Sequence, residues 1–383
     1  MDDTMYTDRM NRRRLLAGLS ALGATGLAGC ATGFSDDEDG NGGNGNGEDV
    51  TESGVGQIGS GREGRGAPGG TPMAEMPDLE GELTVYSGRG EFLVGELVSY
   101  IQEQYDDFSL TVRYAGSTDL VNQIVNEGSG SPADVFYSVN AGALGALADE
   151  GRTQSLPDDV TGMVRSEFRT DEWVGTSGRA RTVPYNTDAY SESDMPSDIM
   201  AYPEFDGDLG WAPSYGSCQA FVTAMRILEG EDATREWLNG VLEAGITSYP
   251  DEFATCQAIA DGEIDAAFTN HYYIQRVLDG NPGASIATAF TEGDAGAVFN
   301  VAGAAVVDTA SDADLASNFV RHLLSAEAQD YFARSTFEYP LIPDVEPIGD
   351  LPTIDELDVP DIDLSQLSDL EPTVDLMRDV GAL

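Results

Sequence analysis

The sequence contains no lysine: its 19 basic residues are all arginine, whereas aspartate and glutamate together number 68. The net charge is −49. A chain this acidic cannot neutralise the phosphates of a nucleic acid, which excludes nucleic acid as a partner. The acids are spread over the whole length, which favours a halophilic protein whose self-repulsion is screened in about 1 M salt. An acidic tail that binds a basic partner is the alternative.

Histidine and cysteine are scarce as well. His271 and His322 are the only histidines, and neither lies near a Gly-x-Ser-x-Gly motif, which argues against a secreted hydrolase. No Walker motif or dinucleotide-binding loop is present. The cysteines, Cys30, Cys218 and Cys256, form no Cys-His cluster with metal-binding spacing. In an exported protein Cys218 and Cys256 could form one disulfide, or they could be two buried free thiols.

The first 30 residues have the pattern of a targeting segment. Arginines at positions 12–14 precede an apolar run, residues 15–29, that is too short and too glycine-rich for a stable membrane span. The run ends in Leu-Ala-Gly-Cys, which looks like a lipobox whose cysteine, Cys30, becomes the lipidated first residue of the mature protein. We therefore predict a twin-arginine lipoprotein signal over residues 1–30. A cysteine that lies near a signal cleavage site by chance is the alternative.

Residues 31–81 are rich in Gly, Asp, Glu, Asn and Ser and lack apolar periodicity. Such a segment cannot bury enough apolar surface to order itself. We predict a disordered acidic linker that tethers a folded domain.

From residue 82 onward, short apolar runs alternate with helical patterns, which is typical of α/β domains with mostly parallel sheets. Predicted strands at 83–86, 110–114 and 133–137 flank predicted helices at 91–105 and 117–127, so the chain begins βαβαβ. The length fits two lobes joined by extended crossovers, with a hinged cleft between them. We predict lobe 1 over 82–182, lobe 2 over 183–297, and a return to lobe 1 with a C-terminal tail over 298–383.

Two adjacent tyrosines, Tyr272 and Tyr273, stand where an apolar run ends and a predicted helix begins. Paired phenols at such a junction can hold a hard cation, and a ferric ion prefers oxygen ligands that carry negative charge. The alternative is that the two rings pack the start of the helix.

Several strings resemble, in order and spacing, the ferric-ion-binding members of the periplasmic solute-binding proteins that serve ABC importers. The strings are at residues 85–89, 131–137, 174–181, 185–187, 210–213, 270–273, 301–304 and 338–341. The resemblance implies a two-lobe, type II periplasmic-binding-protein fold with Tyr272 and Tyr273 as phenolate ligands. It also implies Tyr185, at a crossover between the lobes, as a third ligand, with a hinge-packing aromatic as the alternative.

The chain departs from that family at two ligand positions. Gly90 stands where related proteins have a histidine ligand, and Val139 stands where they have a glutamate ligand. We expect a tyrosine-rich site completed by Glu91, water or an exogenous anion. The alternative for Glu91 is that it only begins a helix, since acids favour helix N-termini.

The resemblance also implies a synergistic anion, carbonate or phosphate, beside the Fe³⁺. Its expected contacts are Ser177, Gly178, Asn270 and Arg89, with Arg179 and Arg181 nearby. The arginines could instead balance neighbouring acids. A further asparagine that contacts the anion in relatives is replaced here by Glu252.

The function that these observations predict is a monomeric, lipid-anchored receptor on the extracellular face of the cell membrane. It would capture ferric iron in its cleft, close by hinge motion, and deliver the iron to an ABC permease driven by a cytoplasmic ATPase. It would catalyse no reaction. The alternatives are a receptor for another small solute, such as an anion or a thiamine-like molecule, and a secreted hydrolase.

Overall fold

The structure is a computed structural model that describes residue 58 and residues 68–383. These residues belong to one compact unit, residues 52–383. The predicted lipoprotein signal, Cys30 and most of the predicted linker lie outside the described residues. In the part of the chain that is described, no helix has both the length and the apolar character needed to cross a membrane.

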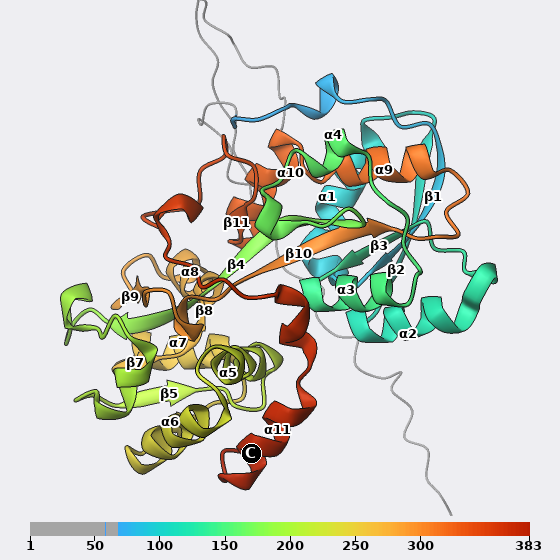
Figure 1. The fold of residues 1–383 in the computed structure, drawn as a ribbon. Helices are drawn as coiled ribbons and strands as arrows, with labels where there is room; N and C mark the ends of the chain where they lie inside the picture. Colours follow the sequence, from blue (N-terminus) through green and yellow to red (C-terminus); the bar gives the residue numbers. More distant parts are fainter. Residues whose placement is uncertain (1–57, 59–67) are drawn as a thin grey trace, which may run out of the picture. The chain divides into compact units, whose positions relative to one another are not determined.

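Lobe 1 is built on a sheet in which β2, β1 and β3 run parallel to one another in that order, and β10 pairs antiparallel with β3 (Figure 1). In Figure 1, α9 lies above this sheet, and α2 and α3 lie below it. The strands are β1 (Gly81–Ser87), β2 (Phe108–Tyr114), β3 (Val135–Ser138) and β10 (Phe299–Val306). The helices are α1 (Glu91–Glu103), α2 (Ser117–Glu127), α3 (Ala141–Asp149), α4 (Asp158–Thr161), α9 (Ala313–His322) and α10 (Ala326–Tyr331).

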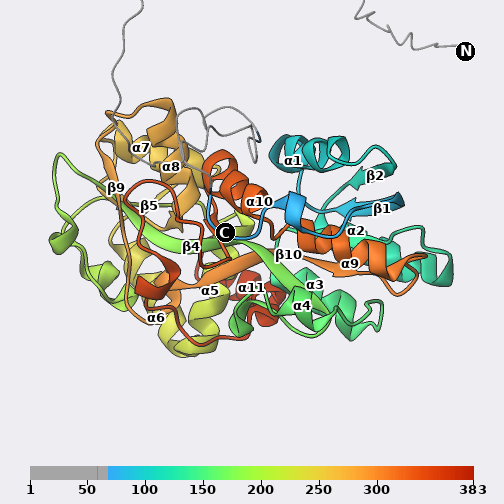
Figure 2. The same ribbon diagram turned by 90° about the horizontal axis from the view of Figure 1, so that it is seen from above.

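The long strand β4 (Trp173–Asn186) carries the chain from lobe 1 into lobe 2. Its first half pairs antiparallel with β10, and its second half pairs with the strands of lobe 2. Figure 2 shows α7 and α8 on one side of the lobe 2 sheet and α5 and α6 on the other. The strands are β5 (Leu209–Trp211), β6 (Thr247–Ser248), β7 (Ala266–Ala267), β8 (Thr269–Asn270) and β9 (Ile286–Ala289). The helices are α5 (Gly216–Leu228), α6 (Glu231–Glu243), α7 (Glu252–Ala260) and α8 (His271–Gly280).

Local sequence explains where several helices start. The side chains of Asn140, Asp251 and Asp312 each accept a hydrogen bond from a backbone N–H in the first turn of the following helix. Such side-chain caps satisfy N–H groups that have no partner within the helix. The α/β architecture with two lobes and extended crossovers, which the alternating pattern predicts, is confirmed.

The predicted linker extends too far toward the fold. Met73 lies in a short 3₁₀ helix and is buried, and Leu79 is buried in the core just before β1. The backbone N–H of Met73 donates to a carboxylate oxygen of Glu327 at 2.9 Å. The apolar residues between 73 and 79 are therefore enough to order this stretch, because each finds a hydrophobic surface of lobe 1 to cover.

The C-terminal residues follow the short strand β11 (Tyr339–Pro340), which pairs with β4. A 3₁₀ helix, Leu364–Ser368, then packs against α3, where a Cβ on Gly142 would lie only 2.4 Å from Cβ of Ser368. The last helix, α11 (Glu371–Asp379), joins α5 of lobe 2 through a hydrogen bond between Thr373 and Thr223 of 2.7 Å. The C-terminal segment thus touches both lobes.

Cys218 and Cys256 are buried free thiols, so the disulfide that the sequence permits does not form between them. Burial raises the pKa of each thiol to about 12. Because the thiolate is the reactive form, we expect neither cysteine to react with Ellman's reagent near neutral pH in the folded protein. A Cys30→Ser variant should show no reactive thiol when it is folded. After unfolding in guanidinium, both Cys218 and Cys256 should react. A thiol that reacts in the folded protein would contradict this burial.

Candidate functional site

A cavity of about 560 Å³ lies where residues of both lobes, both crossover strands and the C-terminal segment meet. Lobe 1 lines it with neutral side chains, among them Thr118, Val139 and Asn140. Lobe 2 lines it with Tyr215 and Tyr272. We call this cavity the interlobe pocket.

Tyr272 and Tyr273 are the second and third residues of α8, and both are buried. Their ring centroids are 4.3 Å apart. The amide of Asn270, the residue before the helix, donates to the Tyr272 hydroxyl at 3.3 Å. The Tyr273 hydroxyl lies 2.7 Å from the hydroxyl of Tyr215. The phenol oxygens of Tyr273 and Tyr215 are therefore in direct contact, and Tyr272 lies beside them.

Sequence reasoning missed Tyr215. This residue directly precedes α5, just as Asn270 and the tyrosine pair stand at the start of α8. Both helices follow lobe 2 strands, and β5 pairs parallel with β7. Ligands of open α/β sheets bind beyond the carboxyl ends of the strands, so a tyrosine between strand 209–211 and the next helix was the signal that could have found it.

Burial raises the pKa of both Tyr272 and Tyr273 above the usual value for tyrosine. The positive charge of Arg179 lowers the pKa of Tyr272 in part. The guanidinium of Arg276 lies 5.1 Å and 5.3 Å from the two ring centroids. The N-terminus of α8 also favours negative charge in its first turn. The pocket thus keeps neutral phenols when it is empty and has groups that favour phenolates once a cation displaces the protons.

Glu252 is fully buried and joins the elements that carry the tyrosines. Its carboxylate accepts hydrogen bonds from Arg181 on β4 at 2.5 Å and from the Ser217 hydroxyl on α5 at 2.5 Å. It also accepts one from the backbone N–H of Asn270 at 3.0 Å. The position at which relatives were expected to hold an anion is therefore occupied by a structural carboxylate, and Arg181 is neutralised by it.

The residues expected at the anion site do not all reach the interlobe pocket. Arg89 is buried, donates to the Ser177 hydroxyl at 2.7 Å, and forms an ion pair with Glu338 at 2.6 Å. Ser177 also donates to Glu338, at 2.9 Å. A Cβ at Gly178 would lie 2.1 Å from the ring of Phe299, so this glycine serves close packing. Arg89 and Ser177 therefore balance and bond a buried carboxylate instead of facing the pocket.

Asn270 and Arg179 do line the interlobe pocket. Arg179 keeps a long ion pair with Glu338, with Nε 3.9 Å from the carboxylate oxygen. Its side chain is 17% exposed, which leaves it the more accessible of the two arginines on the pocket wall, since Arg181 is 3% exposed.

Glu91, Tyr185 and Tyr273 are not among the residues that line this pocket, but the Tyr273 hydroxyl contacts Tyr215, which does line it. Glu91 is exposed in the first turn of α1, where its charge adds to the effect of burial in raising the pKa of Tyr114. Tyr185 lies in the lobe 2 half of β4, opposite Ala266 and Ala287. Four residues of extended chain separate it from Arg181, a span of about 13 Å. The structure therefore brings Tyr272, Tyr273 and Tyr215 together and does not bring Tyr185 or Glu91 to them.

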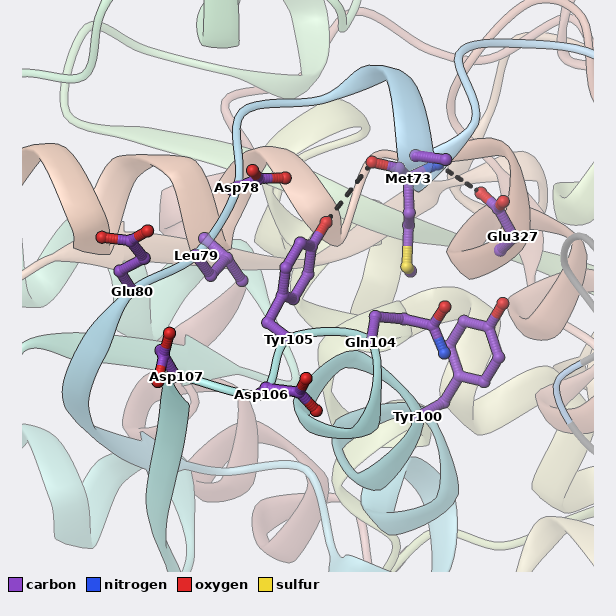
Figure 3. A pocket seen from close by; sticks show the side chains of 11 residues that line it. Met73, Asp78, Leu79, Glu80, Tyr100, Gln104, Tyr105, Asp106, Asp107 and Glu327 are labelled. Atoms are coloured by element: carbon purple, nitrogen blue, oxygen red, sulfur yellow. Dashed lines mark hydrogen bonds between the residues drawn. The ribbon is translucent and has the colours of Figure 1, made fainter.

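A second cavity, of about 670 Å³, lies in lobe 1 (Figure 3). Its carboxylates belong to Asp78, Glu80, Asp106, Asp107 and Glu327. Figure 3 shows these side chains spread around the rim, and the Tyr105 hydroxyl donates to the backbone oxygen of Met73 at 3.4 Å. Within residues 58 and 68–383, no group of three or more His, Cys, Asp or Glu side chains is arranged to hold a metal ion.

Comparison with known proteins agrees with the fold. The sequence profile of the family described as bacterial extracellular solute-binding protein matches residues 96–356. The major ferric iron-binding protein of Neisseria meningitidis serogroup A is 31% identical over 309 residues, 78% of this chain and 93% of the relative. The Fe(3+)-binding periplasmic protein of Serratia marcescens is 28% identical over 319 residues, 81% of this chain and 93% of the relative.

A solved structure of a similar protein supports the same fold. Iron-bound HitA from Pseudomonas aeruginosa superposes with a TM-score of 0.69 at 28% identity, covering 80% of this chain and 100% of that one. The resemblance that the sequence strings carry is thereby confirmed. The chain belongs to the bacterial extracellular solute-binding proteins.

Proposed function

We propose that this protein captures ferric iron in the interlobe pocket, with the phenolates of Tyr272 and Tyr273 as ligands. The observation that carries the proposal is the pair of buried phenols at the start of α8, with a third phenol in contact. Two relatives named for ferric iron binding also support it, because the match to this chain covers 93% of each of them. A phenolate suits Fe³⁺ because a hard trivalent cation prefers anionic oxygen.

Captured iron would pass to an ABC permease and its ATPase, the partners that a solute-binding protein serves. We also propose that the chain acts as a monomer on the extracellular face of the membrane, exported by the twin-arginine route and held there by lipid on Cys30. The Leu-Ala-Gly-Cys string after the arginine-led apolar run supports this anchor. Carbonate or phosphate beside Arg179 and Asn270 would occupy iron positions that the phenolates leave open.

A titration of the protein with ferric citrate in molar salt tests the proposal. We expect a visible tyrosinate-to-iron charge-transfer band that saturates near one iron per chain. If no band appears, with or without added carbonate or phosphate, the tyrosines are not iron ligands. The pocket would then belong to a receptor for an anion or an organic solute.

Iron affinity should fall as the pH falls. The pKa values of Tyr272 and Tyr273 are raised in the empty pocket, so each phenol must release a proton when it binds iron. Two displaced protons predict a loss of about 100-fold in conditional affinity for each pH unit below neutrality, and each further phenol that ionises adds about 10-fold. Competition with citrate at several pH values, with ferric citrate stability measured in parallel, checks this. A pH-independent affinity would mean that no phenol ionises on binding.

A further inference from the structure

We infer that Tyr215 is a third phenolate ligand of the iron, so that one lobe supplies all the negative charge that Fe³⁺ requires. The inference rests on the proposed function. It adds to the ligand set a residue that directly precedes α5 and is distant in the sequence from Tyr272 and Tyr273.

The distance between the hydroxyls of Tyr215 and Tyr273 fits two ligands of one cation. These oxygens lie 2.7 Å apart, and the rings meet edge to face with centroids 6.2 Å apart. A small octahedral cation with metal–oxygen bonds of about 2.0 Å places neighbouring ligand oxygens about 2.8 Å apart. The pair is therefore spaced as two adjacent ligands would be, and in the absence of a cation one hydroxyl donates a hydrogen bond to the other.

The backbone holds Tyr215 in this position. Its N–H donates to the carbonyl of Ala212 at 2.9 Å, and its own carbonyl accepts from Gln219 at 3.1 Å. Glu252 accepts hydrogen bonds from Ser217, two residues after Tyr215, and from Asn270, two residues before Tyr272. One buried carboxylate thus fixes the starts of α5 and α8 relative to each other, which is what a rigid ligand set requires.

The charges around the interlobe pocket call for a third anionic ligand. None of the described residues that line the pocket is an aspartate or a glutamate. On the lobe 1 side the polar groups are neutral, from Thr118, Asn140 and Asn300. Two phenolates would leave one positive charge on Fe³⁺ in a site that already contains Arg179. A third phenolate neutralises the ion and offsets the cost of burying it.

The binding step balances without any electron transfer. Each of the three phenol O–H groups loses its proton to solvent as its oxygen forms a bond to iron, and the iron stays ferric. Three protons leave for each iron bound, while positions not taken by phenolate keep water or an anion.

The experiment compares Tyr215→Phe with the wild type and with Tyr249→Phe, a lobe 2 tyrosine that does not line the pocket. Affinity alone cannot separate a ligand from a residue that only orients Tyr273, because loss of an outer hydrogen bond also costs about 10–100-fold. The number of protons released and the intensity of the charge-transfer band can distinguish these two roles. We expect Tyr215→Phe to release one proton fewer per iron and to lose about a third of the band intensity, a one-in-three loss of phenolates.

If Tyr215→Phe shows the same band intensity and the same proton release as the wild type, Tyr215 is not a ligand, but the proposed function still stands. A wild type without any band would overturn both. Should Tyr215→Phe fail to fold, titration of the wild type with colourless Ga³⁺ decides the matter. Its ultraviolet tyrosinate difference spectrum should report three ionised tyrosines per metal, and a count of two would exclude Tyr215.

Discussion

Tyr273→Phe should lower the affinity for ferric iron by more than about 100-fold, beyond the range that loss of an outer-shell partner produces. The substitution removes one phenolate oxygen and keeps the ring that packs against Tyr272 at 4.3 Å. The folded protein loses the hydrogen bond to Tyr215, so we expect a stability change of only about 1 kcal/mol. Citrate competition measures the affinity, and urea denaturation in molar salt measures the stability.

Tyr185→Phe is the matched control, because it makes the same chemical change at a buried tyrosine in the lobe 2 half of β4, opposite Ala266 and Ala287. It should leave the affinity and the charge-transfer band unchanged. If Tyr273→Phe binds iron as tightly as the wild type, the ligand assignment is wrong. If Tyr185→Phe loses the band instead, the crossover tyrosine is the ligand and the pocket described here is not the iron site.

Arg89→Met should destabilise the fold by about 3–5 kcal/mol, the usual result of leaving one partner of a buried ion pair alone. Arg89 is 1% exposed and pairs with Glu338 at 2.6 Å. Burial alone would raise the pKa of Glu338, but the charges of Arg89 and Arg179 hold that pKa below the ordinary value for glutamate. Without Arg89, the carboxylate keeps hydrogen bonds from the hydroxyls of Ser177 and Thr336, but its remaining ion pair is the long contact with Arg179.

Denaturation in molar salt measures this loss, with Arg235→Met as control. Arg235 is exposed and lies 3.3 Å from Glu231, so removing it should cost less than about 1 kcal/mol. Adding Glu338→Gln to Arg89→Met should restore part of the stability, because the unpaired charge disappears. A stable Arg89→Met protein that binds iron poorly would instead return Arg89 to the anion site that the family resemblance implies.

The local elements could be predicted because their signals are contiguous in the sequence. The strand at 83–86 and the helix from 91 appear as β1, Gly81–Ser87, and α1, Glu91–Glu103. The tyrosine pair could be found for the same reason: Tyr272 and Tyr273 are neighbours, and both follow an apolar run that becomes β7.

The site residues that were missed or misplaced depend on contacts between distant segments. Tyr215 reaches Tyr273 because β5 pairs parallel with β7, with Gly210 opposite Ala267, so that both chains leave the sheet at the same edge. Arg89 turns away from the pocket because its partner, Glu338, lies 249 residues further along the chain. Neither pairing leaves a local trace in composition or periodicity.

By itself, the sequence determined the acidic surface charge, the α/β order of elements, and the two phenols at the start of one helix. These depend on residue chemistry and on short-range periodicity, which any segment carries within itself. The tertiary structure decided the contact of the third phenol, the burial of Glu252 and Glu338, and which of the two arginines on the pocket wall is the more accessible. Those features follow from strand pairing across long loops, since a side chain's partner is fixed only when the sheet brings two distant segments to one edge.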